Sequence, residues 1–362
     1  GIAFVNTLLA SDIIPKKIEG MEIQIPRTLI ICTSWFERFL AENAIMENLK
    51  FLVNDDEIRA FFMKCQLPRE LMQDLRMAIS EFDSPLAIRS SGLLEDSRFL
   101  PFAGIYDTYL VPNSHHDLAV RFRHLLYAIK AVYASTFCEN AKSFINHTNF
   151  RIEDERMAIV IQKVVGRKIN NRFYPDISGV ALSYNFYNIE PLRPEDGIAI
   201  IALGLGHTVV EGRSAFRFCP SYPHILPQFG SPIDYVRLSQ NGFYALDLSD
   251  FSDESEALLK TSFLKFYPLS VAEEDGSLQY LSSVYCVEDD SIKEDVHLSG
   301  PRAVTFNNIL KWQDVPLAQS INIVLQSLRK AMGSAVEIEF AVDLKRHQPS
   351  AVPVLYILQV RP

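Results

Sequence analysis

Four side chains near the end of the chain have the types and the spacing of a site for a cation and a phosphate. In the segment AVEIEFAVDL, Glu337 and Glu339 are two residues apart, and in LYILQVRP the same spacing separates Gln359 and Arg361. Residues two apart on a β-strand share a face, so each pair points to one side of a sheet. Paired carboxylates suit a hard cation such as Mg²⁺, and a guanidinium can bind a phosphate through two hydrogen bonds.

The linker KRHQPSA between these two segments is short enough for an antiparallel hairpin. Strand pairing would then bring both carboxylates, the amide and the guanidinium onto one face, and the opposite face would take Val336, Ile338, Phe340, Leu358 and Val360. The same pattern also fits a half-solvated sheet in which glutamate and arginine simply pair across strands. The residues by themselves leave both interpretations open.

A second polar group begins where an apolar strand ends. The stretch LAIRSSGLLEDSRFLPFAG, residues 86–104, runs from three apolar residues into Arg89, Ser90, Ser91 and Gly92, with Glu95 and Asp96 close behind. An arginine beside a glycine-containing loop is suited to a phosphate. Pairing of Arg89 with Glu95 or Asp96 is the structural alternative.

Helical and strand patterns alternate along the chain and predict a mixed fold, α/β or α+β. Strands are expected at residues 27–32, 86–88, 105–112, 157–165, 178–185, 197–206, 335–344 and 353–362, and helices at 33–43, 56–65, 68–82, 115–145 and 316–333. Ser34 and Glu37 have the spacing of a capping box at the first helix. The acidic segments EDERM (153–157) and VEDDSIKED (287–295) are expected to be solvated faces.

The bulk composition limits the possible partners and the setting. The chain has 362 residues, 48% of them hydrophobic, which suggests two or three lobes. The net charge of -9 argues against nucleic acid as a partner, and no apolar run is long enough to cross a membrane. Five scattered cysteines without a CxxC pair favour a reducing cytoplasm. Because the chain starts with Gly1, we expect it to be a fragment of a longer multidomain protein.

Four segments together resemble the ATP-grasp domain of the phosphoenolpyruvate synthase and pyruvate phosphate dikinase family. The stretch RSSGLLEDSRFLPFAGIYDTYL is similar to the family pattern RSS…ED…FAG…(D/E)T(Y/F)L. VIQKVV resembles its interlobe hinge, ALGLGHTVVEG its GLGE loop, and EIEFAV with YILQVRP its closing pair of strands. The four matches occur in the family order and span nearly the whole chain.

The resemblance implies an ATP-grasp fold of two lobes with mixed and antiparallel sheets, residues 1–164 and 165–362, and ATP clamped by both. It implies phosphate contacts from Arg89, Thr108, Gln359 and Arg361, the two arginines being the catalytic candidates. Adenine and ribose would meet Gln162, Lys163 and Val164, and Glu337 and Glu339 would bind Mg²⁺ or groups on the ribose side.

Family membership further implies a reaction in which ATP pyrophosphorylates a histidine on a separate swivelling domain. Phosphate or water then removes the terminal phosphoryl group, and the phosphohistidine passes its phosphoryl group to pyruvate or another acceptor. The partners would be a phosphohistidine domain and a pyruvate-binding domain outside this chain, with a possible homodimer through those domains. The alternative interpretations are a non-catalytic ATP-sensing module and a dikinase of the same family with a different acceptor, such as pyruvate phosphate dikinase or a rifampin or glucan phosphotransferase.

The sequence departs from the family pattern in several places. The N-terminal GGK motif, whose lysine touches the phosphates, does not occur, and Leu93 stands where the synthases have a hydroxyl residue. His207 replaces the usual acid of the GLGE loop, and RSAF follows where NPD is common. These changes concern the finer nucleotide contacts and the identity of the acceptor.

Overall fold

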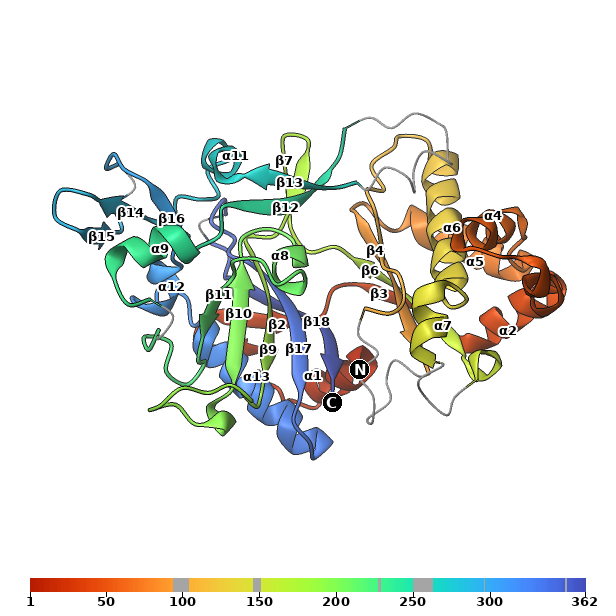
Figure 1. The fold of residues 1–362 in the computed structure, drawn as a ribbon, viewed down its shortest axis with the longest axis horizontal. Coiled ribbons are helices and arrows are strands. Elements are labelled where there is room, and N and C mark those ends of the chain that lie inside the picture. The colour runs from red at the N-terminus through yellow and green to blue at the C-terminus, as the bar shows by residue number, and fades with distance from the viewer. Residues whose placement is uncertain (94–103, 146–150, 227–228, 250–262, 296, 349) are drawn as a thin grey trace. The chain divides into compact units, whose positions relative to one another are not determined.

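The computed structural model describes residues 1–93, 104–145, 151–226, 229–249, 263–295, 297–348 and 350–362. The chain divides into two compact units, each with its own sheets (Figure 1). Unit 1 comprises Gly1–Pro26, Val165–Ala245 and Lys265–Pro362, and unit 2 comprises Arg27–Val164 and Leu246–Leu264. Residues 1–26 therefore pack with the later part of the chain, whereas the sequence expectation assigned them to an N-terminal lobe. The division into functional lobes at residue 164 stays a prediction.

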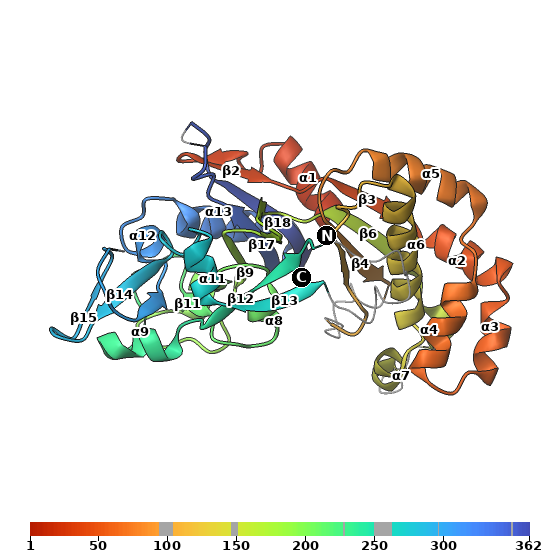
Figure 2. The same cartoon turned by 90° about the horizontal axis from the view of Figure 1, so that it is seen from above.

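Unit 2 is built on a four-stranded antiparallel sheet covered on one face by helices. The strand order is β3 (Thr28–Ile31), β6 (Met157–Lys163), β4 (Leu86–Gly92) and β5 (Tyr109–Val111). The long helix α6 (Leu118–Ser135) packs directly on the sheet, as Figure 2 shows from above. The other helices are α2 (Thr33–Glu42), α3 (Ile45–Asn48), α4 (Asp55–Lys64), α5 (Arg69–Ser80) and α7 (Glu139–Ile145), with short 3₁₀ turns at Leu49–Phe51 and Ile152–Asp154.

Alternation along β4 decides which of its side chains face the helices. Leu86, Ile88 and Ser90 are buried, while Ala87, Arg89 and Ser91 on the other face are only half-buried. An aromatic cluster joins the helices beneath, with Tyr133 of α6 close to Phe36 and Phe39 of α2 (ring centroids 4.9 and 5.4 Å apart). Such ring pairs add to the free energy gained from burying apolar area. The helix-covered face is thus a core, and the face that carries Arg89 is left open.

Two local expectations for unit 2 are wrong. Helix α2 begins at Thr33 with Cys32 as its N-cap and has no side-chain cap, so Ser34 and Glu37 form no capping box. Glu37 instead accepts from Arg156 Nε at 2.6 Å, because a partner distant in sequence outcompetes the local cap. The helical pattern over 115–145 forms two helices, α6 and α7, separated at Thr136–Cys138.

Unit 1 is organised around a seven-stranded sheet. Its order is β1 (Lys17–Ile18), β2 (Met21–Gln24), β18 (Val354–Arg361), β17 (Glu337–Asp343), β9 (Ile177–Leu182), β10 (Ile198–Ala202) and β11 (Phe216–Phe218). β18 and β2 run parallel and the other paired strands run antiparallel. Helix α13 (Leu317–Met332) lies against one face, contacting β9 and β2 (Figure 2).

Two smaller sheets and several short helices complete unit 1. One sheet has the order β13 (Leu264–Pro268), β12 (Gly242–Asp247), β8 (Arg172–Tyr174) and β7 (Arg167–Ile169), and the other β15 (Ser291–Lys293), β14 (Ser282–Cys286) and β16 (Arg302–Val304). The helices are α1 (Ile2–Ala10), α8 (His207–Val210), α9 (Pro232–Leu238), α11 (Leu269–Glu274) and α12 (Asn307–Leu310), with a 3₁₀ turn at Pro194–Asp196. The mixed α and β composition with mostly antiparallel sheets confirms the predicted fold class.

Candidate functional site

The closing strands form the predicted antiparallel hairpin. β17 pairs with β18 so that Glu337 lies opposite Arg361 and Glu339 lies opposite Gln359. Directly opposite residues share a face of the sheet, and the intervening Ile338 and Val360 are buried on the other face. The two carboxylates, the amide and the guanidinium therefore lie together on one side of the sheet in unit 1.

A β-bulge adjusts this hairpin beside the site. The register shifts between Glu339 and Phe340, because Phe340 pairs with Ile357 while Glu339 pairs with Gln359. Leu358 is therefore an extra residue of β18 and is half-buried rather than part of the inner face. The expected position of Leu358 is wrong, since simple alternation fails where a bulge adds one residue to a strand.

Arg361 links the two carboxylates electrostatically. Its Nη1 lies 3.7 Å from Glu337 Oε1, and its Nη2 lies 3.8 Å from Glu339 Oε1. Burial raises the pKa of Glu337 above its usual value and Glu339 adds to this rise, while Arg361 opposes it. These ion pairs are longer than hydrogen bonds, so the guanidinium balances the charge of both carboxylates through electrostatic attraction.

An apolar strip borders the charged group on the same face. Val180 of β9 pairs with Glu339, and Leu182 pairs with Glu337. Their neighbours on β10 are Ile200 and Ile198, and all four apolar side chains are half-buried. The opposite face of the sheet is occupied by α13 and the core. The uncovered face thus offers an apolar floor next to acids and a cation.

The glycine loop after β10 reaches the same charged group. Gly204 has φ +87°, and its carbonyl oxygen accepts a hydrogen bond from Ser178 Oγ (2.6 Å), while Leu205 N donates to Tyr244 O (2.9 Å). His207 begins α8, and its ring centroid lies 5.7 Å from that of Tyr244. Burial lowers the pKa of His207, and the charges of Glu211 and Glu339 oppose this. His207 therefore lies within electrostatic reach of the hairpin.

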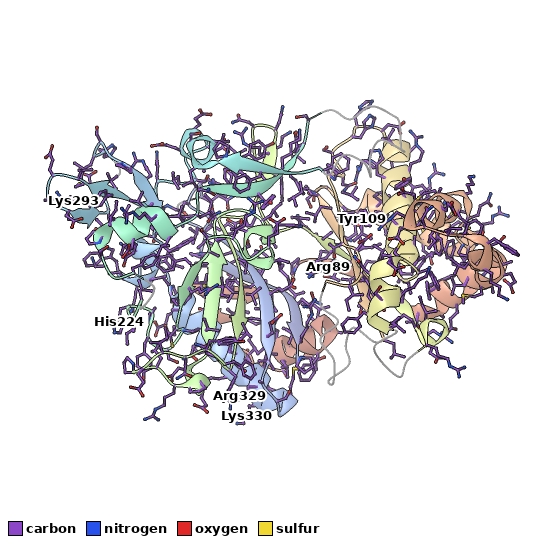
Figure 3. The ribbon with its side chains drawn as sticks, in the orientation of Figure 1. Arg89, Tyr109, His224, Lys293, Arg329 and Lys330 are labelled. Carbon is purple, nitrogen blue, oxygen red and sulfur yellow. The ribbon has the colours of Figure 1, made fainter. Side chains whose placement is uncertain are left out.

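Unit 2 presents its own predicted residues on the open face of its sheet. Ala87 lies opposite Gln162 and Arg89 lies opposite Val160, so Gln162 and Arg89 share that face. The β4–β5 register ends at Ile88 opposite Tyr109, and its continuation by one residue puts Arg89 opposite Thr108, which is exposed. Figure 3 labels Arg89 and Tyr109 on this sheet.

The predicted hinge residues Gln162, Lys163 and Val164 make different hydrogen bonds and ion pairs within unit 2. Gln162 is buried and its Nε2 donates to Thr28 Oγ1 at 3.3 Å. Lys163 lies 3.5 Å from Asp83 and lowers the pKa of that carboxyl group. The backbone N–H groups of Lys163 and Val164 donate to Arg27 O and Pro85 O, both at 2.9 Å. In this structure these two N–H groups are engaged within unit 2.

Comparisons with known proteins show the family of this chain. The profile of the family described as "Pyruvate phosphate dikinase, AMP/ATP-binding domain" matches residues 12–362. The chain belongs to this family. It is 27% identical over 222 residues to a phosphoenolpyruvate synthase of Deinococcus radiodurans, covering 55% of this chain and 26% of the relative.

Other relatives carry different names. The chain is 24% identical over 214 residues to a rifampicin phosphotransferase of Bacillus cereus, covering 54% of this chain and 22% of the relative. It is 24% identical over 275 residues to an uncharacterized phosphotransferase of Bacillus subtilis, covering 70% of this chain and 30% of the relative. This AMP/ATP-binding domain therefore spans less than a third of the length of these relatives.

Sequence reasoning missed one buried acid in this AMP/ATP-binding domain. Glu155, in the segment EDERM that was expected to be solvated, is only 1% exposed. It precedes Met157 of β6 by two residues, so extending the strand's alternation backwards would have placed it on the core side. Glu95 and Asp96, the alternative partners of Arg89, lie outside the described residues.

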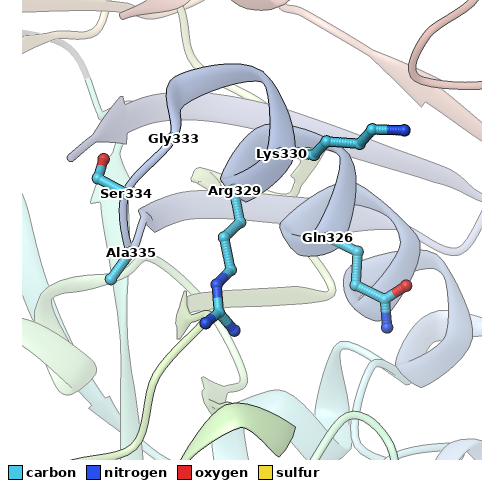
Figure 4. A pocket seen from close by; sticks show the side chains of 6 residues that line it. All are labelled: Gln326, Arg329, Lys330, Gly333, Ser334 and Ala335. Atoms are coloured by element: carbon cyan, nitrogen blue, oxygen red, sulfur yellow. The ribbon is translucent and has the colours of Figure 1, made fainter.

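One cavity of unit 1 lies apart from the predicted site residues. A cavity of about 470 Å³ at the end of α13 is lined by Gln326, Arg329, Lys330, Gly333, Ser334 and Ala335 (Figure 4). None of the predicted site residues lines it, and its two cations stand in the last helical turn, where they offset the helix dipole. Among the described residues, no group of three or more His, Cys, Asp and Glu side chains could hold a metal ion, and no helix is long and apolar enough to cross a membrane.

Proposed function

We propose that this chain is the nucleotide-binding part of a phosphoenolpyruvate synthase-like phosphotransferase. It binds Mg·ATP and donates phosphoryl groups to a histidine on a domain outside residues 1–362. In the complete reaction pyruvate and ATP become phosphoenolpyruvate, AMP and phosphate. Family membership supports ATP as the bound nucleotide, and the names of several relatives support the reaction class.

The observation that carries this proposal is the convergence of Glu337, Glu339, Gln359 and Arg361 on one uncovered sheet face. Phosphoryl transfer needs positioned cations and hydrogen-bond donors more than covalent catalysis. Arg361 supplies a guanidinium that lies 3.7 Å from Glu337 and 3.8 Å from Glu339 and has the geometry to bind phosphate oxygens. Arg89 supplies a second guanidinium from the open face of unit 2, with the hydroxyl of Thr108 beside it.

The two glutamates fit a magnesium ion that arrives with the nucleotide. Mg²⁺ is usually held by one or two carboxylates together with substrate phosphates and water, so a dedicated cage of protein ligands is unnecessary. Glu337 and Glu339 would hold the ion, which bridges phosphate oxygens and neutralises their charge. Burial and the charge of Glu339 raise the pKa of Glu337. A cation bound at this position would oppose that rise and favour the ionised carboxylate.

The hinge would read the base and the ribose. Because the N–H groups of Lys163 and Val164 already donate within unit 2, we expect recognition there to use carbonyl oxygens and the side chain of Gln162. The ammonium of Lys163 contributes through its pairing with Asp83 and stays away from the open face.

The acceptor of the phosphoryl group is a separate part of the proposal. Pyruvate is favoured by the three relatives named phosphoenolpyruvate synthase, while the relative named rifampicin phosphotransferase favours a different acceptor. A non-catalytic ATP sensor is the competing candidate, and the observations that favour it are Leu93 and His207, which stand where the family has a hydroxyl residue and an acid. We further propose a magnesium-dependent cytoplasmic enzyme whose phosphohistidine domain, acceptor domain and homodimer contacts lie outside this chain.

Two experiments test the proposal. Release of AMP and phosphate is measured from the full-length protein with and without pyruvate, and AMP formed with pyruvate supports the synthase reaction. No AMP with any acceptor would refute the enzyme and favour the sensor. Titration calorimetry of the 362-residue chain tests the pocket, because Arg89→Ala combined with Arg361→Ala should abolish most of the Mg·ATP affinity. Unchanged affinity would count against the proposed residues.

A further inference from the structure

A buried glutamate ties together two segments of unit 2 that carry proposed phosphate ligands. Glu155 Oε1 accepts hydrogen bonds from Leu93 N (2.7 Å) and Arg156 N (2.9 Å), and its Oε2 accepts from the hydroxyl of Tyr106 (2.6 Å). Leu93 follows the end of β4, and Tyr106 lies shortly before β5. One carboxylate is therefore bonded to two residues that precede it by 62 and 49 positions in the sequence.

The three donors explain how an acid can be buried here. Glu155 is 1% exposed and Tyr106 is 6% exposed, and removing an ionised carboxylate from water is costly unless donors replace the lost hydration. Hydrogen bonds to a charged acceptor are stronger than hydrogen bonds between neutral groups, and the loss of a donor from a buried carboxylate oxygen costs free energy. The arrangement is thus stiff, since moving either segment breaks a charge-assisted hydrogen bond.

The packing around the carboxylate is equally close. A Cβ added to Gly92 would lie 3.0 Å from Tyr106 Cε2 and 3.1 Å from Glu155 Oε1. The tyrosine ring and the carboxylate therefore press against the backbone of the last residue of β4. Leu93 N also donates to Arg156 O at 3.1 Å, which extends the β4–β6 pairing by one step.

The position of this cluster relative to the strand pairing gives it a role. The β4–β5 register ends at Ile88 and Tyr109, one residue before Arg89 and Thr108. Beyond that point the bonds of Glu155 to Leu93 and Tyr106 connect the two segments again. On the other side of β5, Arg59 Nη1 lies 2.8 Å from Asp107 Oδ2 and 2.7 Å from Tyr109 OH, which fixes the neighbours of Thr108.

We propose that Glu155 is a positioning residue of the nucleotide site: by holding Leu93 and Tyr106 together, it keeps Arg89 and Thr108 side by side at the end of the strand pairing. Glu155 itself faces the core and touches no phosphate. This inference rests on the proposed function, because it assumes that Arg89 and Thr108 bind the phosphates of ATP. It predicts that weakening the bonds of Glu155 reduces phosphate recognition more than recognition of the nucleoside.

The test compares Mg·ATP and adenosine affinity by calorimetry in the 362-residue chain. Tyr106→Phe removes only the hydroxyl, and Glu155→Gln removes the charge and replaces one acceptor oxygen by an N–H donor. Both should lower the ratio of ATP to adenosine affinity by about 2- to 30-fold, the range over which residues without ligand contact change the coupling between sites. Tyr280→Phe in unit 1, which also removes a tyrosine hydroxyl bonded to an aspartate, is the matched control and should leave the ratio unchanged.

The outcomes separate this inference from the proposed function. If Arg89→Ala lowers the ratio while Tyr106→Phe and Glu155→Gln do not, the proposed function stands and the positioning role is overturned. If Arg89→Ala has no effect, the phosphate role of Arg89 fails, and the inference fails with it. Equal losses of ATP and adenosine affinity, together with a lower unfolding temperature, would show a general structural role and would also overturn the inference.

Discussion

Substituting Gly204 tests whether the glycine loop beside His207 is fixed by the close approach that the structure shows. Gly204 has φ +87°, and a Cβ there would lie 2.6 Å from Tyr244 O and 3.0 Å from Phe243 Cδ2. The oxygen of Tyr244 cannot easily retreat, because it accepts the hydrogen bond from Leu205 N. Gly204→Ala therefore combines a disfavoured backbone conformation with a clash against a fixed carbonyl group.

Gly212 provides the matched control. It also has a positive φ, +66°, but a Cβ there would meet nothing within 4 Å. A left-handed conformation costs an alanine about 1–2 kcal/mol. Replacing glycine by alanine also reduces the conformational entropy of the unfolded chain, which stabilises the folded state by about 0.4–1 kcal/mol and offsets part of that cost. We expect Gly212→Ala to lower the free energy of unfolding by about 1 kcal/mol. Gly204→Ala carries an additional overpacking cost of about 1–3 kcal/mol.

The assay must report on unit 1 separately, because two units need not unfold in one step. The chain contains two tryptophans, Trp35 in unit 2 and Trp312 in unit 1. Urea unfolding followed by the fluorescence of Trp312 in a Trp35→Phe background isolates unit 1. Equal losses of stability in Gly204→Ala and Gly212→Ala would refute the close approach. A larger loss in Gly204→Ala, with weaker Mg·ATP binding, is the expected result.

Two further predictions concern buried charges of unit 1. Arg172→Met should lower the free energy of unfolding by about 3–5 kcal/mol, because it leaves the fully buried Asp275 carboxylate without its guanidinium. Arg302→Met, at the more exposed pair with Glu273, should lower it by about 1 kcal/mol or less, and similar losses of the two variants in urea titrations would contradict this ranking. Burial raises the pKa of Asp176, so the folded state keeps this proton to higher pH than the unfolded chain, and this stabilisation is lost as the pH rises through the raised pKa. Asp176→Asn should therefore gain stability relative to the natural chain as the pH rises above about 4, the ordinary pKa of an aspartate, and a difference that does not change with pH would argue against the raised pKa.

The sequence predicted much of the site because its key patterns are local. Alternation in EIEFAV and YILQVRP identified which side chains share a face, and the short linker between them indicated the hairpin that the structure confirms. The same kind of reasoning located the strand that carries Arg89. Its expected end at residue 88 was four residues too early, because β4 continues through polar residues as far as Gly92.

Other features depended on partners that are distant in the sequence. Strand alternation could have placed Glu155 on the core side, but nothing in EDERM showed its hydrogen-bond donors Leu93 and Tyr106, which lie 62 and 49 residues away. The ammonium of Lys163 pairs with Asp83 of another segment, and Glu37 pairs with Arg156 instead of capping its own helix. Such choices are made by competition among all nearby groups, which no local pattern contains.

The sequence by itself determined the family, the types of side chain and the faces on which they lie, because residue identity and strand alternation require no tertiary information. Only the tertiary structure decided the register that puts Glu337 opposite Arg361, the bulge that displaces Leu358, and the position of His207 near Glu339. The physical reason is that register, bulges and burial follow from packing and charge balance between segments far apart in the chain.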